Sequence, residues 1–113
     1  MKPILPSLLA MSLVWAANSL AADKKIVFIA GSISHGPGDH EHRAGCLLLK
    51  FCLDRVPGVT SAVYSNGWPQ NPEAAFAGAA TVVIFSDGGG GHPFLRGDRL
   101  KTIGGLMNKG VGL

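Results

Sequence analysis

The chain has 113 residues, 16 of them glycine, and a formal net charge of +3. This length allows one small domain. The basic residues are scattered along the chain and the charge excess is small, which argues against a nucleic-acid-binding protein.

Residues 1–21 have the pattern of a secretory signal peptide. Lys2 supplies a positive start, residues 4–17 are largely apolar, and Ser19 and Ala21 are small residues at the positions that a signal peptidase reads. The apolar stretch is too short to span a bilayer stably. We therefore expect a secreted or periplasmic protein that begins at Ala22 and does not associate with a membrane after cleavage. A buried first helix is the alternative.

The next part of the chain predicts a strand followed by a helix. Residues 26–30 are continuously apolar, which is typical of a central parallel strand buried on both faces. A loop then leads to an expected helix over residues 41–56 with Asp39 as its N-cap. The face expected to be buried follows helical spacing and is apolar except for its last residue; it comprises Ala44, Leu47, Leu48, Phe51, Cys52 and Arg55.

The remainder repeats this alternation. Residues 59–64 predict a second strand, and residues 71–79 a short helix capped by Asn71 with Pro72 at its first position. A third apolar strand is expected over residues 80–85, and a helix over residues 98–109 ended by Gly110 at the C′ position. Residues 111–113 have the composition of the first part of a fourth strand.

This order predicts an α/β fold with a parallel sheet sandwiched by helices, the strands arranged 2-1-3-4 and the chain truncated at the start of the fourth strand. Cys46 and Cys52 would stand six residues apart on one helix. Their separation of about 9 Å along the helix axis is too large for a disulfide, so we expect two buried free thiols.

All four histidines lie in the loops that follow the first and third strands. These strands are neighbours in the expected order, so their loops should meet at the carboxyl edge of the sheet. Imidazoles with nearby carboxylates suit a divalent metal such as zinc, the one cofactor that the residues suggest. The alternative is a helix N-terminus with polar capping residues. The candidate metal ligands are His35, His40, His42 and His92.

Three separated motifs resemble the amino-terminal half of the trehalose-utilisation (ThuA-like) family. They are residues 24–45, which end in Ser-His-Gly-Pro-Gly-Asp-His-Glu-His-Arg-Ala-Gly, then Tyr-Ser-Asn-Gly-Trp-Pro at 64–69 and Asp-Gly-Gly-Gly-Gly-His-Pro at 87–93. The resemblance implies a class I glutamine amidotransferase-like fold, which is flavodoxin-like, and a link to sugar metabolism with a small saccharide as ligand. In catalytic relatives a nucleophile elbow follows the next strand, beyond Leu113. A non-catalytic carbohydrate- or metal-binding module, or a truncated product without independent function, are therefore the alternatives to an enzyme.

The two loops also supply candidate residues for catalysis and anion binding. We expect proton transfer from His35, Asp87 and His92, although Asp87 could instead bond the amides of its own glycine turn. The glycine run matches the family's oxyanion loop by position and could offer backbone N–H groups to an anion. It could equally be a flexible loop in which side chains would clash. The run is formed by Gly88, Gly89, Gly90 and Gly91.

Two further side chains are candidates for binding a saccharide. Arg43 could clamp a carboxylate or a sugar hydroxyl, or be an ordinary exposed residue of a first helical turn. Trp68 could stack on a sugar ring, or belong to a loop folded over the core.

The signal-peptide pattern makes a direct prediction. The exported protein should begin at Ala22, because Ser19 and Ala21 are small residues that follow the apolar stretch. Amino-terminal sequencing of the exported protein tests this, and an exported protein that retains Met1 would contradict it.

Overall fold

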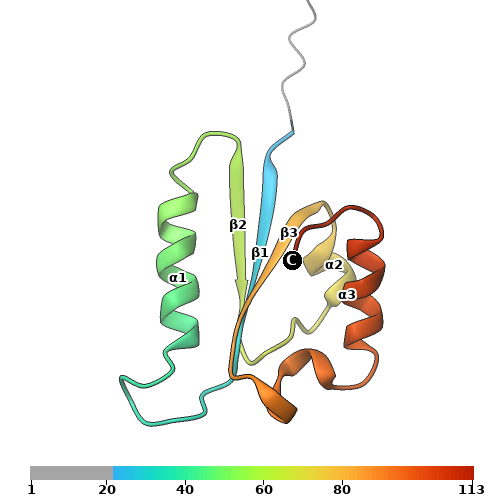
Figure 1. Ribbon diagram of the computed structural model, residues 1–113. Helices are drawn as coiled ribbons and strands as arrows, with labels where there is room; N and C mark the ends of the chain where they lie inside the picture. Colours follow the sequence, from blue (N-terminus) through green and yellow to red (C-terminus); the bar gives the residue numbers. More distant parts are fainter. Residues whose placement is uncertain (1–21) are drawn as a thin grey trace, which may run out of the picture.

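The computed structural model describes residues 22–113, so the expected signal peptide lies outside the described residues. Three parallel strands form the sheet, namely β1 (Lys24–Ala30), β2 (Val59–Tyr64) and β3 (Ala79–Phe85) (Figure 1). Their order is β2-β1-β3. The prediction of a buried central first strand is therefore confirmed, and its residues from Val27 to Ala30 are almost inaccessible to solvent.

The last residues of the chain return to the sheet beside β3. Gly112 forms a parallel bridge with Thr81. The Val82 N–H donates to the Gly112 carbonyl oxygen at 2.9 Å, and the Gly112 N–H donates to the Ala80 carbonyl oxygen at 3.0 Å. Because β1 occupies the other side of β3, these residues extend the sheet in the expected order 2-1-3-4.

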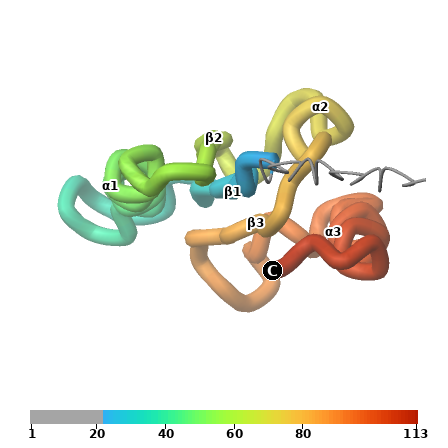
Figure 2. The backbone as a smooth tube through the Cα atoms, turned by 90° about the horizontal axis from the view of Figure 1, so that it is seen from above, coloured from blue at the N-terminus to red at the C-terminus, as the bar shows by residue number. Residues whose placement is uncertain are grey.

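Helices cover both faces of the sheet. Helix α1 (His42–Leu53) lies on one side, and α2 (Pro72–Phe76) and α3 (Arg99–Met107) lie on the other (Figures 1 and 2). Two short 3₁₀ turns, η1 (Gly89–Gly91) and η2 (Pro93–Leu95), connect β3 to α3. The α/β class is thus confirmed. In the part of the chain that the structure describes, no helix has the length and hydropathy needed to cross a membrane.

The alternation of side chains along β1 divides the core in two. Val27 and Ile29 pack on the α2–α3 side, with the buried side chains Phe76, Val82, Phe94 and Ile103. Phe28 and Ala30 pack on the α1 side with Cys46. A strand buried on both faces in this way must be apolar at every position, as residues 26–30 are.

The predicted start of α2 and the predicted end of α3 agree with the hydrogen bonding. Helix α2 ends at Phe76 rather than at residue 79, because the chain turns at Gly78, whose φ is 68°, and enters β3 at Ala79. The Asn71 side chain accepts from the Ala74 N–H at 3.1 Å, with Pro72 next to it, which is the expected N-cap of α2. Beyond α3, Gly110 has a φ of 88°. Its N–H donates to the Met107 carbonyl oxygen at 2.9 Å, and the Val111 N–H donates to the Leu106 carbonyl oxygen at 3.1 Å. These two bonds form a Schellman motif with Gly110 at C′.

The start of α1 differs from the prediction. The helix begins at His42, and its N-cap Glu41 makes no capping hydrogen bond with its side chain. Asp39 is therefore not the N-cap, and it lies in the preceding loop. The cause is a turn at His40, whose φ of 46° is left-handed and takes the chain out of the helical path. The Glu41 carboxylate instead accepts from the Gly38 N–H at 2.9 Å within the loop.

The rotation of α1 also differs from the prediction. His42 and Cys46 are the buried residues of the helix, and one turn further Lys50 donates through Nζ to the Ser61 carbonyl oxygen at 2.9 Å. The predicted buried face is turned to solvent, with Leu48 and Phe51 63% and 57% exposed. Burial of His42 at the first position sets this rotation, because side chains four residues apart share one face.

The rotation of α1 also decides how exposed the two cysteines are. Both thiols are free, as predicted. Only Cys46 is buried, however, and burial raises the pKa of its thiol. Cys52 is exposed, so the prediction of a second buried thiol is wrong.

The glycine pair in α3 allows a stability prediction. An added Cβ at Gly104 meets no atom within 4 Å, so Gly104→Ala should stabilise the protein by about 1 kcal/mol through helix propensity alone. Urea unfolding at neutral pH measures this change. Gly31→Ala is the matched control and should destabilise, because its Cβ would lie 2.7 Å from the Ser86 Cβ. A Gly104→Ala protein less stable than the parent would contradict the prediction.

Candidate functional site

The carboxyl ends of the strands are joined by close backbone contacts. The Gly31 N–H donates to the Phe85 carbonyl oxygen and the Gly67 N–H to the Ala30 carbonyl oxygen, each at 2.8 Å. Gly31 also lies so near Ser86 that a side chain would not fit between them. These contacts bring the loops after β1 and β3 together, as expected from the strand order.

A cluster of two histidines and one aspartate forms where these loops meet. His40 Nδ1 lies 2.7 Å from Asp87 Oδ1, and the ring centroids of His35 and His40 are 3.9 Å apart. One possible ligand atom from each of His35, His40 and Asp87 lies within 4.8 Å of the others. We call these three residues the His–Asp cluster. Both histidines are exposed and Asp87 is half-buried, so the cluster is accessible from solvent.

His42 lies behind the His–Asp cluster and is buried. Its Nδ1 is 3.3 Å from the Ser32 carbonyl oxygen, and its Nε2 is 3.6 Å from Asp87 Oδ1. The ring also meets Phe85 edge-on at a centroid distance of 4.9 Å. These contacts tie the start of α1 to both loops, so His42 positions the cluster rather than belonging to it.

The surroundings of Asp87 favour its ionised form. The Ser34 hydroxyl, then the hydrogen bond and charge of His40 and the charge of His42, hold the pKa of Asp87 below its ordinary value against partial desolvation. Ser34 Oγ also lies 3.0 Å from His35 Nδ1. Asp87 therefore reaches across to the other loop, and it is a ready carboxylate ligand near neutral pH.

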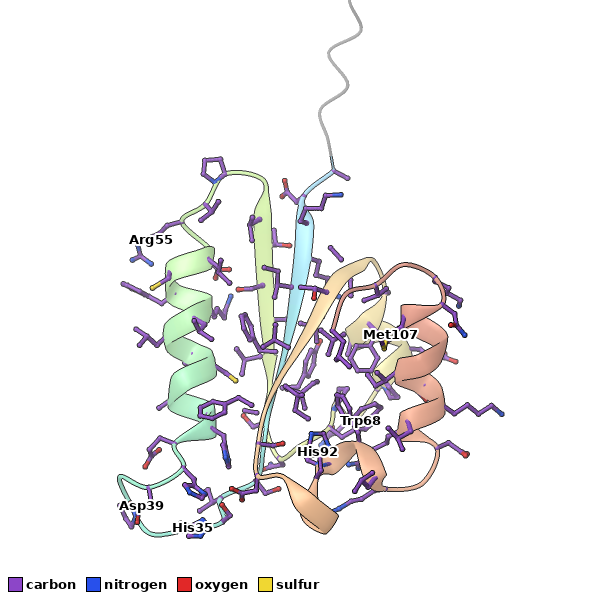
Figure 3. The ribbon with its side chains drawn as sticks, viewed as in Figure 1. His35, Asp39, Arg55, Trp68, His92 and Met107 are labelled. Atoms are coloured by element: carbon purple, nitrogen blue, oxygen red, sulfur yellow. The ribbon has the colours of Figure 1, made fainter. Side chains whose placement is uncertain are left out.

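His92 stands apart from the other three histidines. Its Nδ1 accepts from the Phe94 N–H at 3.2 Å, and its ring packs edge-on against Phe94 at a centroid distance of 5.1 Å. It thereby caps η2 on the α3 side of the sheet, away from His35 (Figure 3). Within residues 22–113, the group able to hold a metal is the His–Asp cluster, which includes neither His92 nor His42.

The other predicted binding residues have different surroundings. Arg43 lines a cavity of about 380 Å³ together with His35, His40 and His42. Trp68 packs edge-on between Phe76 and Phe94, at centroid distances of 5.4 and 5.8 Å. This placement favours the interpretation of Trp68 as part of a loop folded over the core.

The glycine run is open rather than crowded. An added Cβ at any of Gly88, Gly89, Gly90 or Gly91 would meet no atom within 4 Å, so the expected clash of side chains is absent there. Gly89 alone has a left-handed φ, of 62°, which favours glycine. Gly91 alone of the run lines a cavity at the strand ends, and it does so together with Arg96 and Arg99.

Sequence reasoning missed these two arginines. They follow the glycine run at a spacing of three, Arg96-x-x-Arg99, just where a helix begins. Positive charge at a helix N-terminus opposes the helix dipole, and this mismatch is a signal that could have identified them.

No family model, curated protein or solved structure matches this chain.

The lowered pKa of Asp87 predicts a pH dependence of stability. Ionised Asp87 stabilises the folded state above its unfolded pKa of about 3.9, and this contribution is lost as the pH falls through the lower folded pKa. The difference in unfolding free energy between the parent and Asp87→Asn should therefore shrink between pH 5 and about pH 2. Urea unfolding across this range measures the difference.

A Ser34→Ala background provides the control for this experiment. Since the Ser34 hydroxyl is the largest cause of the lowered pKa, its removal should make the pH dependence shallower. A difference between the parent and Asp87→Asn that stays constant over the whole range would contradict the assignment.

Proposed function

We propose that this chain is a ThuA-like domain that binds a divalent metal, such as zinc, through His35, His40 and Asp87. The observation that supports the proposal is the meeting of these three side chains, which come from two loops and have ligand atoms within 4.8 Å of one another. We further propose that the domain acts on a small saccharide at this edge of the sheet. The sugar class and a secreted or periplasmic location are supported by the family resemblance and by the pattern of residues 1–21.

The donor set suits zinc. Two imidazoles and one carboxylate are common zinc ligands, and a site with three protein ligands keeps a position for water or substrate. Ligand atoms at zinc distances in a tetrahedral site lie about 3.4 Å apart. His40 Nδ1 and Asp87 Oδ1 are 2.7 Å apart and would have to separate slightly, whereas the ligand atoms of the three residues lie within 4.8 Å of one another and the widest pair would have to approach. Both histidines belong to an exposed loop, which can accommodate such a movement.

A bound metal would polarise a hydroxyl or carbonyl oxygen of the ligand. The residues of the chain would do the rest. The cavity beside the cluster measures about 380 Å³, within the range of small-molecule sites. Arg43 on its wall would hydrogen-bond hydroxyl oxygens, and His42 would keep the loop and the start of α1 together.

A metal-free acid–base site is the second candidate. The 2.7 Å contact between His40 and Asp87 resembles a carboxylate-oriented imidazole, in which the carboxylate fixes the tautomer and stabilises the protonated ring. His40 would then take a proton from a substrate hydroxyl. The position of His35 beside His40 is compatible with either candidate function. Metal binding is therefore the property that distinguishes the metal site from the metal-free acid–base site.

Calorimetric titration with Zn²⁺ tests the metal proposal. The parent protein should bind one equivalent, and His35→Ala, His40→Ala and Asp87→Asn should each weaken binding at least tenfold, since each removes a ligand. His92→Ala is the matched control and should bind zinc as the parent does, because His92 caps η2 instead.

Two results would count against the metal site. The first is equal zinc binding by all four variants, and the second is loss of binding in His92→Ala with binding kept in His40→Ala. If the parent binds no zinc, the acid–base candidate becomes the better one.

A further inference from the structure

A second cavity of about 260 Å³ lies at the same edge of the sheet, beside the His–Asp cluster. We call it the arginine pocket. Residues following all three strands line it, including Ser34, Asn66, Asp87 and Gly91, and two arginines close it, Arg96 and Arg99. Gly31, Ser32 and Ile33 line both this pocket and the cavity beside the cluster, so the two spaces share a wall.

Within the described chain, the two arginines of the arginine pocket are not held in ion pairs. Among the described residues, neither Arg96 nor Arg99 makes a salt bridge. They also lie at the start of α3, which is the positive end of the helix dipole. The N-cap Asp98 makes no capping hydrogen bond with its side chain, and in the described part of the chain it forms no salt bridge with either arginine.

Arg99 is held in place by contacts that leave its charge available. Its Nη1 donates to the Pro93 carbonyl oxygen at 3.0 Å, and its guanidinium carbon lies 5.0 Å from the centroid of the Trp68 ring. Burial and the neighbouring Arg96 both lower the pKa of Arg99, which means that the two guanidinium groups repel each other. An anion placed between them would remove this repulsion.

We infer that the arginine pocket binds the carboxylate of a small polyhydroxylated acid, a sugar acid, with Arg96 and Arg99 as its anion-binding residues. Asp87 gives the ligand its orientation. As a carboxylate it repels an anion and accepts hydrogen bonds from hydroxyl groups. The acid end of the ligand therefore lies at the arginines, and a hydroxyl end points to Asp87 and the His–Asp cluster.

Size and charge favour a carboxylate over a phosphate. The pocket is smaller than the usual 300–1,000 Å³ of small-molecule sites, so it suits a short ligand. A planar carboxylate matches the fork of a guanidinium and carries one charge. A phosphate would carry more charge into a space that Asp87 also lines. This inference rests on the proposed function for the saccharide class of the ligand, but the need for an anionic group depends on the arginines alone.

Calorimetric titration of the purified protein with gluconate, glucose and inorganic phosphate tests the inference, in buffer containing a chelator so that no metal contributes. Gluconate and glucose have the same number of carbons, but gluconate is an open-chain carboxylate and glucose a neutral, mainly cyclic sugar, so the arginine variants assign any preference to the carboxylate. The parent should bind gluconate at least tenfold more tightly than glucose, and more tightly than phosphate. Arg96→Gln and Arg99→Gln should each weaken gluconate binding about tenfold or more, as expected for a charged hydrogen bond.

Three comparisons make the test specific. Arg55→Gln should leave gluconate binding within twofold of the parent, because Arg55 lies over the Phe51 ring of α1 and lines neither cavity. Arg99 also supports the fold, so a variant that keeps its positive charge is needed. Arg99→Lys should bind gluconate more tightly than Arg99→Gln does. Raising the salt concentration should weaken gluconate binding and leave glucose binding unchanged.

Equal binding of gluconate and glucose by the parent, unchanged gluconate binding by Arg96→Gln, or a preference for phosphate would each overturn the inference. Failure of the metal proposal would give a different result. The zinc titration would then show no binding at the His–Asp cluster, while the arginine-dependent binding of gluconate would remain.

Discussion

The close approach of β1 and β3 at their carboxyl ends is the constraint on which the site depends. Gly31 hydrogen-bonds the Phe85 carbonyl oxygen and lies against Ser86 with no room for a side chain. Because β1 is the central strand, this contact brings a long loop from its end to the first residues after β3. Asp87 is one of those residues, and it meets His40 from the other loop. Without the contact, the histidines and the aspartate would belong to separate surface loops.

Asp87 divides the edge of the sheet into two regions of different chemistry. Histidines surround its carboxylate on one side, and the arginine pocket begins on the other. The carboxylate is kept ionised by the Ser34 hydroxyl and by the imidazoles, so it can hold a cation or accept a hydrogen bond. The proposed cation site and the proposed anion site on either side of one acceptor would together select a ligand with unlike ends. A sugar acid has this property, because it carries hydroxyls and a carboxylate on one short chain.

The burial of His42 couples the site to the fold. Its ring touches the loop after β1 through Ser32, the end of β3 through Phe85, and the neighbourhood of Asp87. The same residue is the first of α1 and decides which face of that helix meets the sheet. A consequence is that Leu48 and Phe51 are exposed while Lys50 reaches back to the Ser61 carbonyl. Arg55 lies over the Phe51 ring and covers part of this apolar surface.

Local patterns in the sequence determined the strands, the strand order and several helix ends. The apolar run before Gly31 is typical of a strand buried on both faces, which is what it forms. Asn71-Pro72 begins one helix and Gly110 ends another, through bonds between near neighbours. Those features depend on residues within a few positions of one another, which is why they could be predicted. The proximity of the two histidine-bearing loops also followed, because neighbouring parallel strands end at the same edge of the sheet.

Only the tertiary structure decided the membership of the site and the rotation of α1. The left-handed turn at His40 delays the helix, and its ring is then free to meet Asp87, 47 residues further along the chain. In the sequence His92 looks as good a candidate ligand as His35, since both are histidines in loops that follow strands. Its side chain instead accepts a hydrogen bond from the Phe94 N–H, away from the His–Asp cluster. Arg96 and Arg99 matter because neither forms a salt bridge within residues 22–113, and ion pairing depends on the distances between side chains from different elements. Such distances are set by packing, which no pattern of neighbouring residues encodes.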